Sequence, residues 1–117
     1  MNKCILMGRI ARDPDVRATQ SGKRVARLTL AVDRRKGKDN QQPADFINLI
    51  VWDKLAEFVD SFIKKGIKLL VEGRLQTRTY EDQAGEKKYI TEVVVNDIEF
   101  AESKKKETAE PEELPFS

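Results

Sequence analysis

The sequence predicts a small all-β domain of five strands, with one helix between the third and the fourth strand. With 117 residues, the chain can bury one hydrophobic core and not two, which indicates a single domain. Apolar and polar residues alternate along several stretches with the period of two that is typical of β-strands. Between residues 53 and 63 the apolar residues instead recur at the spacing of one helical turn.

The first two predicted strands are residues 2–10 and residues 25–34. The first is dense in Ile, Leu and Met, and Gly8 indicates a bend or a bulge near its end. The second alternates between an apolar face and a face with polar residues. Residues 11–23 are predicted to be a connection, because they contain two clusters of the turn formers Asp, Pro, Ser and Gly.

The third predicted strand, residues 45–52, follows a polar, basic loop and carries large apolar side chains on both faces. One face consists of Ile47, Leu49 and Val51, and the other of Phe46, Asn48, Ile50 and Trp52. The first face can fill the core. The second either belongs to the core of a two-sided strand or puts two aromatic rings on a surface, and Trp52 is the only tryptophan of the chain.

The predicted helix begins at Asp53, the expected N-cap, and ends at Lys64-Lys65-Gly66, a basic last turn with a glycine stop. Its apolar stripe is predicted to face the core and consists of Leu55, Phe58, Val59, Phe62 and Ile63. Residues 67–79 and 88–100 are the fourth and fifth predicted strands. A hairpin loop is expected between them.

Five strands with a helix between the third and the fourth is the element order of an OB-fold, a partly open Greek-key barrel. A five-stranded α+β sandwich is the alternative that this order leaves open. Residues 1–101 are expected to form the domain. Residues 102–117 are rich in Glu, Lys, Thr and Pro and lack the apolar content to fold alone, which predicts a disordered acidic tail.

The composition argues against an enzyme. The chain has no His, which removes the commonest general base, the triads that use His and most zinc sites, so no metal and no other cofactor is expected. The single Cys4 cannot form an internal disulfide and is expected to be a small buried residue rather than a reactive thiol. No stretch resembles a membrane helix or a signal peptide, so a cytoplasmic protein is expected.

The net charge of +2 hides two parts of opposite sign. Residues 107–117 contain four Glu and no Lys or Arg, so residues 1–106 carry a net charge of +6. A basic body predicts a polyanion as partner, and an acidic end predicts a different role for the tail.

Aromatic and basic residues are interleaved on one predicted surface. Phe46 and Trp52 of the third strand share it with Arg74, Arg78 and Tyr80 of the fourth. Because rings stack on bases and cations bind phosphates, this pattern is typical of a surface that holds a single nucleic-acid strand without reading its sequence. Taken one at a time, these residues also fit strand packing or ordinary solvated surface.

The chain also resembles the bacterial, or phage-encoded, single-stranded DNA-binding proteins over about residues 2–100. The resemblance rests on stretches in the family's order and spacing, which are residues 2–9 (NKCILMGR), 13–17 (DPDVR), 45–48 (DFIN), 52–57 (WDKLAE), 65–66 (KG), 72–78 (EGRLQTR) and 91–93 (TEV). It implies an OB-fold that assembles as a homotetramer and wraps single-stranded DNA without sequence preference.

The resemblance places three base-stacking positions on Phe46, Trp52 and Tyr80. It places phosphate contacts on Lys3, Arg34, Lys54, Arg74, Arg78 and Lys87, and the basic loop before the third strand adds Arg35 and Lys36. A fourth stacking position in that loop is usually aromatic in the family. Here the loop offers Lys36 and no ring, which puts this stacking platform in doubt.

The tail resembles the acidic tip with which family members dock on replication and repair enzymes. The corresponding residues are Glu112, Glu113, Leu114, Pro115 and Phe116. The tip has Glu where Asp is usual. In the family the Phe is the last residue and its carboxylate is part of what partners recognise, whereas here Ser117 follows Phe116, which predicts weaker docking. A merely solubilising acidic end is the alternative.

The expected function is non-catalytic binding and protection of single-stranded DNA in replication, recombination and repair, with recruitment of partner enzymes through the tip. The alternative is an OB-fold protein-interaction module of a replication or primosome complex, for which nucleic acid is incidental.

Overall fold

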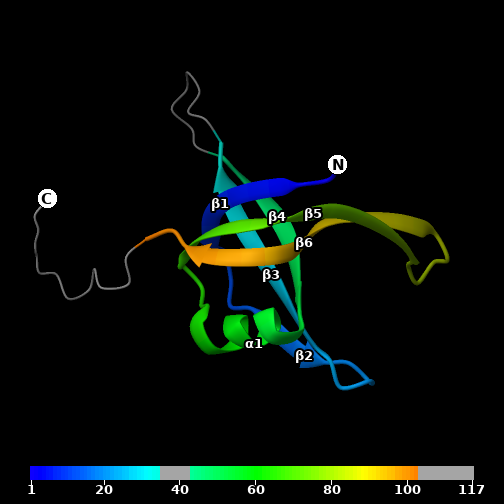
Figure 1. Cartoon of the computed structure of the whole chain (residues 1–117). Helices are drawn as coiled ribbons and strands as arrows, with labels where there is room; N and C mark the ends of the chain where they lie inside the picture. The colour runs from blue at the N-terminus through cyan, green and yellow to red at the C-terminus, as the bar shows by residue number, and fades with distance from the viewer. Residues whose placement is uncertain (35–42, 103–117) are drawn as a thin grey trace, which may run out of the picture.

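The structure is a computed structural model that describes residues 1–34 and 43–102. In it the chain folds into a closed β-barrel with one helix (Figure 1). The elements are β1 (Cys4–Ile10), β2 (Asp15–Ala18), β3 (Arg24–Asp33), β4 (Ala44–Trp52), α1 (Asp53–Phe62), β5 (Lys68–Glu81) and β6 (Lys87–Phe100). The strand order is β1-β5-β6-β4-β3-β2, and an additional pairing of β1 with β3 closes the barrel. The prediction of an OB-fold is confirmed, and the closure argues against the α+β sandwich.

The short strand β2 differs from the prediction, which treats residues 11–23 as a connection. It pairs antiparallel with residues 24–27 of β3, around a turn in which Gly22 has a φ of 90°. Only Val16 of its four residues is even partly buried. The apolar alternation that signals a strand is therefore absent, which explains why the sequence pattern missed it.

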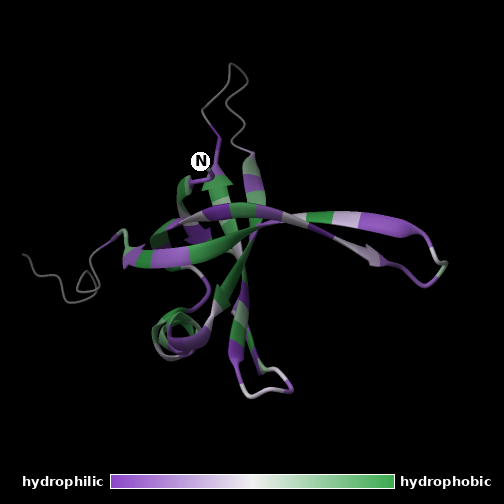
Figure 2. Ribbon diagram, turned by 45° about the vertical axis from the view of Figure 1, so that its right-hand side comes forward, coloured by the Kyte–Doolittle hydropathy of each residue, from purple (hydrophilic) through white to green (hydrophobic). Residues whose placement is uncertain are grey.

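The core fills the barrel, and α1 closes one end of it. On β4, Leu49 and Val51 are buried and Ile47 is partly buried, as the alternation predicted. From α1, Val59 contributes fully buried surface. Cys4 is partly buried and packs against the core. Figure 2 shows the resulting alternation of hydrophobic and hydrophilic residues along the strands.

Two details of α1 correct the prediction. Trp52, not Asp53, holds the N-cap position and makes no side-chain capping bond. Asp53 instead has a φ of 60°, a conformation that the surrounding structure must impose on a non-glycine residue. Phe62 lies at the margin of the apolar stripe and is 54% exposed, with its ring centroid 5.2 Å from that of Phe58. Its assignment to the core is wrong.

The end of α1 also differs from the sequence pattern. The helix ends at Phe62, so Lys64 and Lys65 lie beyond the last turn and not within it. Gly66 has a φ of 93°, but it lies in the turn after the helix and is not its stop, because the C-cap is Ile63 in an extended conformation. Neither α1 nor any other helix in the described part of the chain has the length and apolarity needed to cross a membrane.

Glycines allow close approach of strands where the barrel closes. A Cβ on Gly8 would collide with the carbonyl oxygen of Ala31, beside the point where β1 starts to pair with β3. The predicted bulge is not at Gly8, because β1 pairs with β5 without a shift. A register shift that the sequence did not predict occurs instead on the β5–β6 ladder, between Glu72 and Gly73.

Beyond the barrel, β5 and β6 continue as a two-stranded arm that projects to one side (Figure 1). Residues 74–81 of β5 pair with residues 87–94 of β6 in a constant register. The carboxylate of Asp82 fixes the turn, because its Oδ1 accepts hydrogen bonds of 2.9 Å from the backbone N–H groups of Ala84 and Glu86. The arm thereby carries Tyr80 away from the barrel.

Candidate nucleic-acid interface

The outer surface of β3 and β4 presents rows of facing residues set by the strand register. These outward pairs are Val25 with Trp52, Arg27 with Ile50, Thr29 with Asn48, and Ala31 with Phe46. Phe46 is 65% exposed and Trp52 is 41% exposed, so the structure places both rings on a surface and not in the core. They lie about 20 Å apart, because they are six positions apart on a strand that rises ~3.3 Å per residue.

Strand β6 continues this surface on the other side of β4. In the parallel register, Ile50 is level with Val94, and Val94 in turn pairs with Arg74 of β5. Ile50 and Val94 are both buried. They form an apolar floor between Arg27 on one side and Arg74 on the other.

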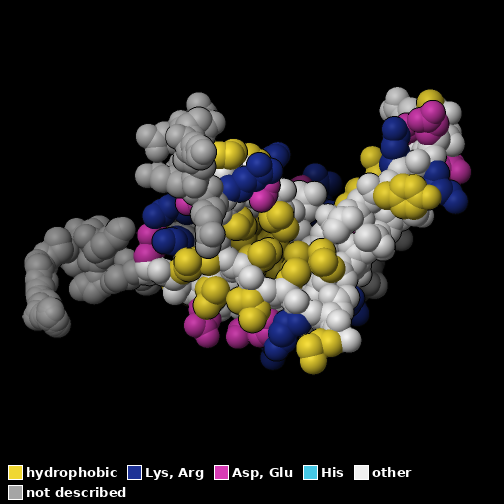
Figure 3. All heavy atoms as spheres, turned by 90° about the horizontal axis from the view of Figure 1, so that it is seen from above, with side chains coloured by type: hydrophobic (Ala, Val, Ile, Leu, Met, Phe, Trp, Pro, Cys, Tyr) yellow, Lys and Arg dark blue, Asp and Glu magenta, His cyan; other side chains and the backbone are white. Residues whose placement is uncertain are grey.

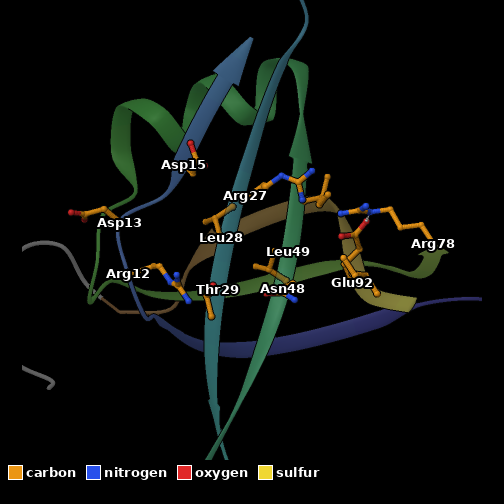
Figure 4. A pocket seen from close by; sticks show the side chains of 12 residues that line it. Arg12, Asp13, Asp15, Arg27, Leu28, Thr29, Asn48, Leu49, Arg78 and Glu92 are labelled. Carbon is orange, nitrogen blue, oxygen red and sulfur yellow. Dashed lines mark hydrogen bonds and ion pairs between the residues drawn. The ribbon is translucent and has the colours of Figure 1, made fainter. Parts of the chain in front are cut away.

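A hollow of about 300 Å³, here called the central groove, lies in this surface (Figure 4). Strands β3 and β4 form its floor, the β1–β2 segment one wall, and the arm the other wall. The polar and charged lining residues are Arg12, Asp13, Asp15, Arg27, Thr29, Asn48, Arg78 and Glu92. This is the face of an OB-fold, flanked by two connecting segments, at which oligonucleotides commonly bind.

Glu92 is the only buried charged residue in the described part of the chain, with 1% of its surface exposed. Its Oε2 accepts a hydrogen bond of 3.0 Å from Nε of Arg78 and one of 2.9 Å from Nε2 of Gln76. The outward face of Gln76 and Arg78 agrees with the strand pattern. Glu92 was missed, because a single Glu before three valines gives no sign that it turns toward two donors on the neighbouring strand.

Arg12 and Arg27 were also absent from the predicted site. Arg27 belongs to the face with polar residues on the second predicted strand, but only the structure brings it to the groove. Arg12 lies in a stretch that was treated as a plain connection. A basic residue two positions before the turn former Pro14 is the one available signal, and it is a weak one.

Several predicted phosphate contacts lie at or near the groove. Arg74 and Arg78 occupy the outer face of β5, and Lys54 is exposed in the first turn of α1, two residues after Trp52. Arg34 stands where β3 ends, and its Nη2 and Nε lie 2.8 Å and 2.9 Å from Oδ1 of Asp45. This hydrogen bond and the charge of Asp45 raise the pKa of Arg34, which stays cationic.

The structure does not bring the other predicted cations to the groove. Lys3 forms an ion pair of 3.1 Å with Glu72, which pairs with Ile5 and lies on the same face of the sheet as Ile5. Lys87 pairs with Glu81 and therefore points away from the arm face that carries Tyr80. Arg35 and Lys36, with the loop position of the fourth stacking platform, lie outside the described residues.

Tyr80 lies on the arm and is 45% exposed. It shares a face with Arg78, since residues two apart in a strand point to the same side. Tyr89, still more exposed, pairs with Thr79 and so lies on the opposite face. The three predicted rings are thus exposed and spread from β4 to the arm, so a ligand must cross the whole surface to meet all of them.

A closed barrel, a groove lined by arginines and exposed rings beside it define an OB-fold protein of the oligonucleotide-binding class. The comparison with known families agrees, because residues 1–101 match the single-strand binding protein family. The chain belongs to this family, as the resemblance of its motifs indicated.

Curated relatives are similar to most of the chain. A single-stranded DNA-binding protein 1 of Staphylococcus aureus is 50% identical over 105 residues, which cover 89% of this chain and 67% of the relative. A single-stranded DNA-binding protein 2 of Listeria monocytogenes is 49% identical over 105 residues, 89% of this chain and 66% of the relative. A third, from Clostridium acetobutylicum, is 46% identical over 103 residues, 87% of this chain and 72% of the relative. These names are those of binding proteins and not of enzymes.

Proposed function

We propose that this protein binds single-stranded DNA without sequence preference and without catalysis. The proposal is carried by one observation, the exposure of Phe46 and Trp52 on one face of β4, beside the arginine-lined central groove. Every base has a face on which a ring can stack, and arginines bind phosphates whatever the sequence. The names of the relatives support the same substrate.

The geometry favours a single strand over a duplex. The rings stand on a strand of the barrel, about 20 Å apart along β4, and a base reaches such a ring only when it is unpaired and unstacked. In a duplex the bases are stacked on one another and offer only their edges and the backbone. We propose that binding of this kind protects exposed single strands during replication, recombination and repair, and that the protein acts in the cytoplasm, at the nucleoid.

Titration with oligo-dT and with duplex DNA, followed by the fluorescence of Trp52 at several salt concentrations, tests the proposal. Oligo-dT alone is expected to quench the fluorescence strongly. The logarithm of the binding constant is expected to fall with that of the salt concentration by about 0.7 per phosphate neutralised. Equal affinity for duplex, or no binding at low salt, would overturn the function. Binding without quenching would remove only Trp52 from the interface.

We also propose that the working form is a homotetramer. On the face of β1 and β5 away from the central groove, Ile5, Met7 and Leu70 are exposed, and Figure 3 shows hydrophobic side chains gathered across the face viewed from above. Residues 4–8 of β1 pair with β5 on one edge only, as far as the described strands go. An unpaired strand edge beside apolar side chains favours pairing with a second copy.

The oligomeric state can be tested with Met7→Glu. In sedimentation equilibrium the wild-type chain is expected to have the mass of four protomers. The variant is expected to dissociate, because burying a carboxylate without a partner is unfavourable. Tyr89→Glu, a change at a still more exposed apolar residue on the arm, measures the effect of added charge alone. A wild-type monomer would contradict the proposal.

Residues 1–101 are proposed to be the DNA-binding domain, and residues 102–117 a tail that recruits replication and repair proteins through the tip at residues 112–116. The tip lies outside the described residues, so this part of the proposal rests on the sequence. A pull-down from lysate with and without residues 112–116 tests it. Identical sets of captured proteins would contradict recruitment through the tip.

A further inference from the structure

We propose that Arg27 and Arg78 together bind one phosphate of the DNA strand, and that Glu92 is a positioning residue that sets Arg78 for this contact. The inference rests on the proposed binding of single-stranded DNA and specifies a subsite within the central groove. Its two arginines come from strands β3 and β5, on opposite sides of the groove (Figure 4).

Arg27 carries a positive charge that nothing in the described part of the chain neutralises. Its guanidinium makes no hydrogen bond or ion pair within residues 1–34 and 43–102. Its neighbour on β4 is the apolar Ile50, and its neighbour on β2 is Asp15. The carboxylate of Asp15 is already engaged, since its Oδ1 lies 3.0 Å from Nε of Arg17. Arg27 is therefore available to an anion from outside.

Arg78, by contrast, is held in place. Its Nε donates to the buried Glu92, which Gln76 fixes through a second hydrogen bond to the same oxygen. A guanidinium has five N–H donors in a rigid plane. One donor is used by Glu92, so the terminal Nη groups remain free. The carboxylate thus fixes the plane of Arg78 without occupying the groups that would bind a phosphate.

The strand register brings these residues to one place. Val94 is level with Ile50, and Ile50 pairs with Arg27. Glu92 lies two residues before Val94 on β6, and Arg78 lies two residues beyond Gln76, the partner of Glu92. Arg27 and Arg78 therefore approach the position of Glu92 from opposite directions. Figure 4 shows their side chains pointing toward one another across the groove.

The charges of this group favour one further anion. Two guanidinium groups face a single carboxylate, which leaves a net charge of +1 above an apolar floor. Charge-assisted hydrogen bonds from Arg to phosphate are short and strong, and two arginines can share the oxygens of one phosphodiester. A nucleic-acid strand supplies such a group at every nucleotide, so the subsite would fix the strand between the two stacking rings of β4.

Arg27→Gln tests the subsite in the full chain, with labelled oligo-dT and anisotropy at several salt concentrations. Affinity is expected to fall about tenfold, the effect of one charge-assisted hydrogen bond in a site open to water. The salt slope is expected to change little, because Arg78 still neutralises the same phosphate. Arg24→Gln is the matched control, because Arg24 lies on the opposite face of β3 and pairs with Asp60 at 3.8 Å. Equal effects of the two variants would overturn the subsite.

The double variant Arg27→Gln with Arg78→Gln distinguishes one shared phosphate from two. If both arginines bind the same phosphate, the salt slope is expected to decrease by about 0.7 in total, and a decrease of about 1.4 would overturn the sharing. If Arg78→Gln does not fold, it is introduced together with Glu92→Gln, which removes the buried carboxylate that would otherwise lose its partner.

Glu92→Gln tests the positioning role. In this background Arg78→Gln is expected to change affinity less than twofold, compared with about tenfold in the wild type. A purely structural role of Glu92 predicts the same change in both backgrounds and would overturn positioning. Absence of any binding by the wild-type protein would overturn the proposed function itself, whereas wild-type binding that is unaffected by Arg27→Gln would overturn the subsite alone.

Discussion

Replacement of Trp52 by Ala is expected to weaken binding of single-stranded DNA by about 1–3 kcal/mol, the range found for one base–aromatic stack in proteins of this class. Phe46→Ala is expected to have an effect of the same size. Because both rings are exposed on β4, their removal leaves no cavity in the core, and the fold is expected to persist. The two rings lie about 20 Å apart, too far to share a base, so the losses are expected to add.

The measurement is the anisotropy of a labelled oligo-dT, since Trp52→Ala removes the intrinsic fluorophore. Phe62→Ala is the matched control. Phe62 is an aromatic residue of similar exposure, but it lies at the end of α1 and away from the central groove, so its removal is expected to leave affinity unchanged. A lower Tm with unchanged affinity in Trp52→Ala and Phe46→Ala would mean that these rings serve packing and not binding.

The sequence predicts which residues of β4 share a face, but it does not predict whether the face with Phe46 and Trp52 is buried in the core or exposed to solvent. The alternation around Leu49 requires only that one face be buried, and Phe46 and Trp52 lie on the other face in either interpretation. What exposes them is the closure of the barrel by the pairing of β1 with β3. That pairing joins residues about twenty positions apart in the chain, and it depends on the absence of a Cβ at Gly8.

The face on which Glu92 lies depends on a register shift between β5 and β6 that no local sequence pattern predicts. The β5–β6 register shifts by one residue between Glu72 and Gly73, and a shift of one residue turns every later side chain to the other face. Because of this shift, Glu92 faces Gln76 and lies on the groove side. Val93, Val94 and Val95 are apolar in succession, so the sequence gives no alternation from which the face could be read.

Short elements and element ends escaped prediction for a related reason. Strand β2 is mostly exposed, and its formation depends on pairing with β3 rather than on its own composition. At the margin of α1, Phe62 continues the helical spacing of the apolar residues but has no barrel wall to pack against. Periodicity predicts the direction of a side chain, whereas burial depends on which element covers that direction.

Arg78→Ala is expected to lower the free energy of unfolding by about 2 kcal/mol. Removing one partner of a buried ion pair costs about 3–5 kcal/mol when both are buried, and here solvent screens part of the interaction, because the side chain of Arg78 is 38% exposed while that of Glu92 is 1% exposed. The loss arises chiefly from the carboxylate of Glu92, which would remain buried with only Gln76 as a donor. Urea denaturation measures the difference.

Arg17→Ala provides a control with the same pair of atom types at the same distance. Nε of Arg17 lies 3.0 Å from Oδ1 of Asp15, as Nε of Arg78 lies 3.0 Å from Oε2 of Glu92, but both members of the Arg17 pair are exposed. Its loss is expected to cost about 0–1 kcal/mol. Similar losses for both variants would show that the burial of Glu92 has little energetic consequence.

A second substitution separates the buried charge from lost packing. Glu92→Gln, introduced into Arg78→Ala, removes the charge while keeping an oxygen that can accept a hydrogen bond from Gln76. If the unpaired carboxylate causes the loss, the double variant is expected to be about 1 kcal/mol more stable than Arg78→Ala, because a neutral amide costs less to bury than a charge. An equal or lower stability would assign the loss to the packing of the Arg78 side chain. The stabilising effect of Arg78 would then come from its packing in the groove, and the charge of Glu92 would make no measurable contribution to the free energy of unfolding.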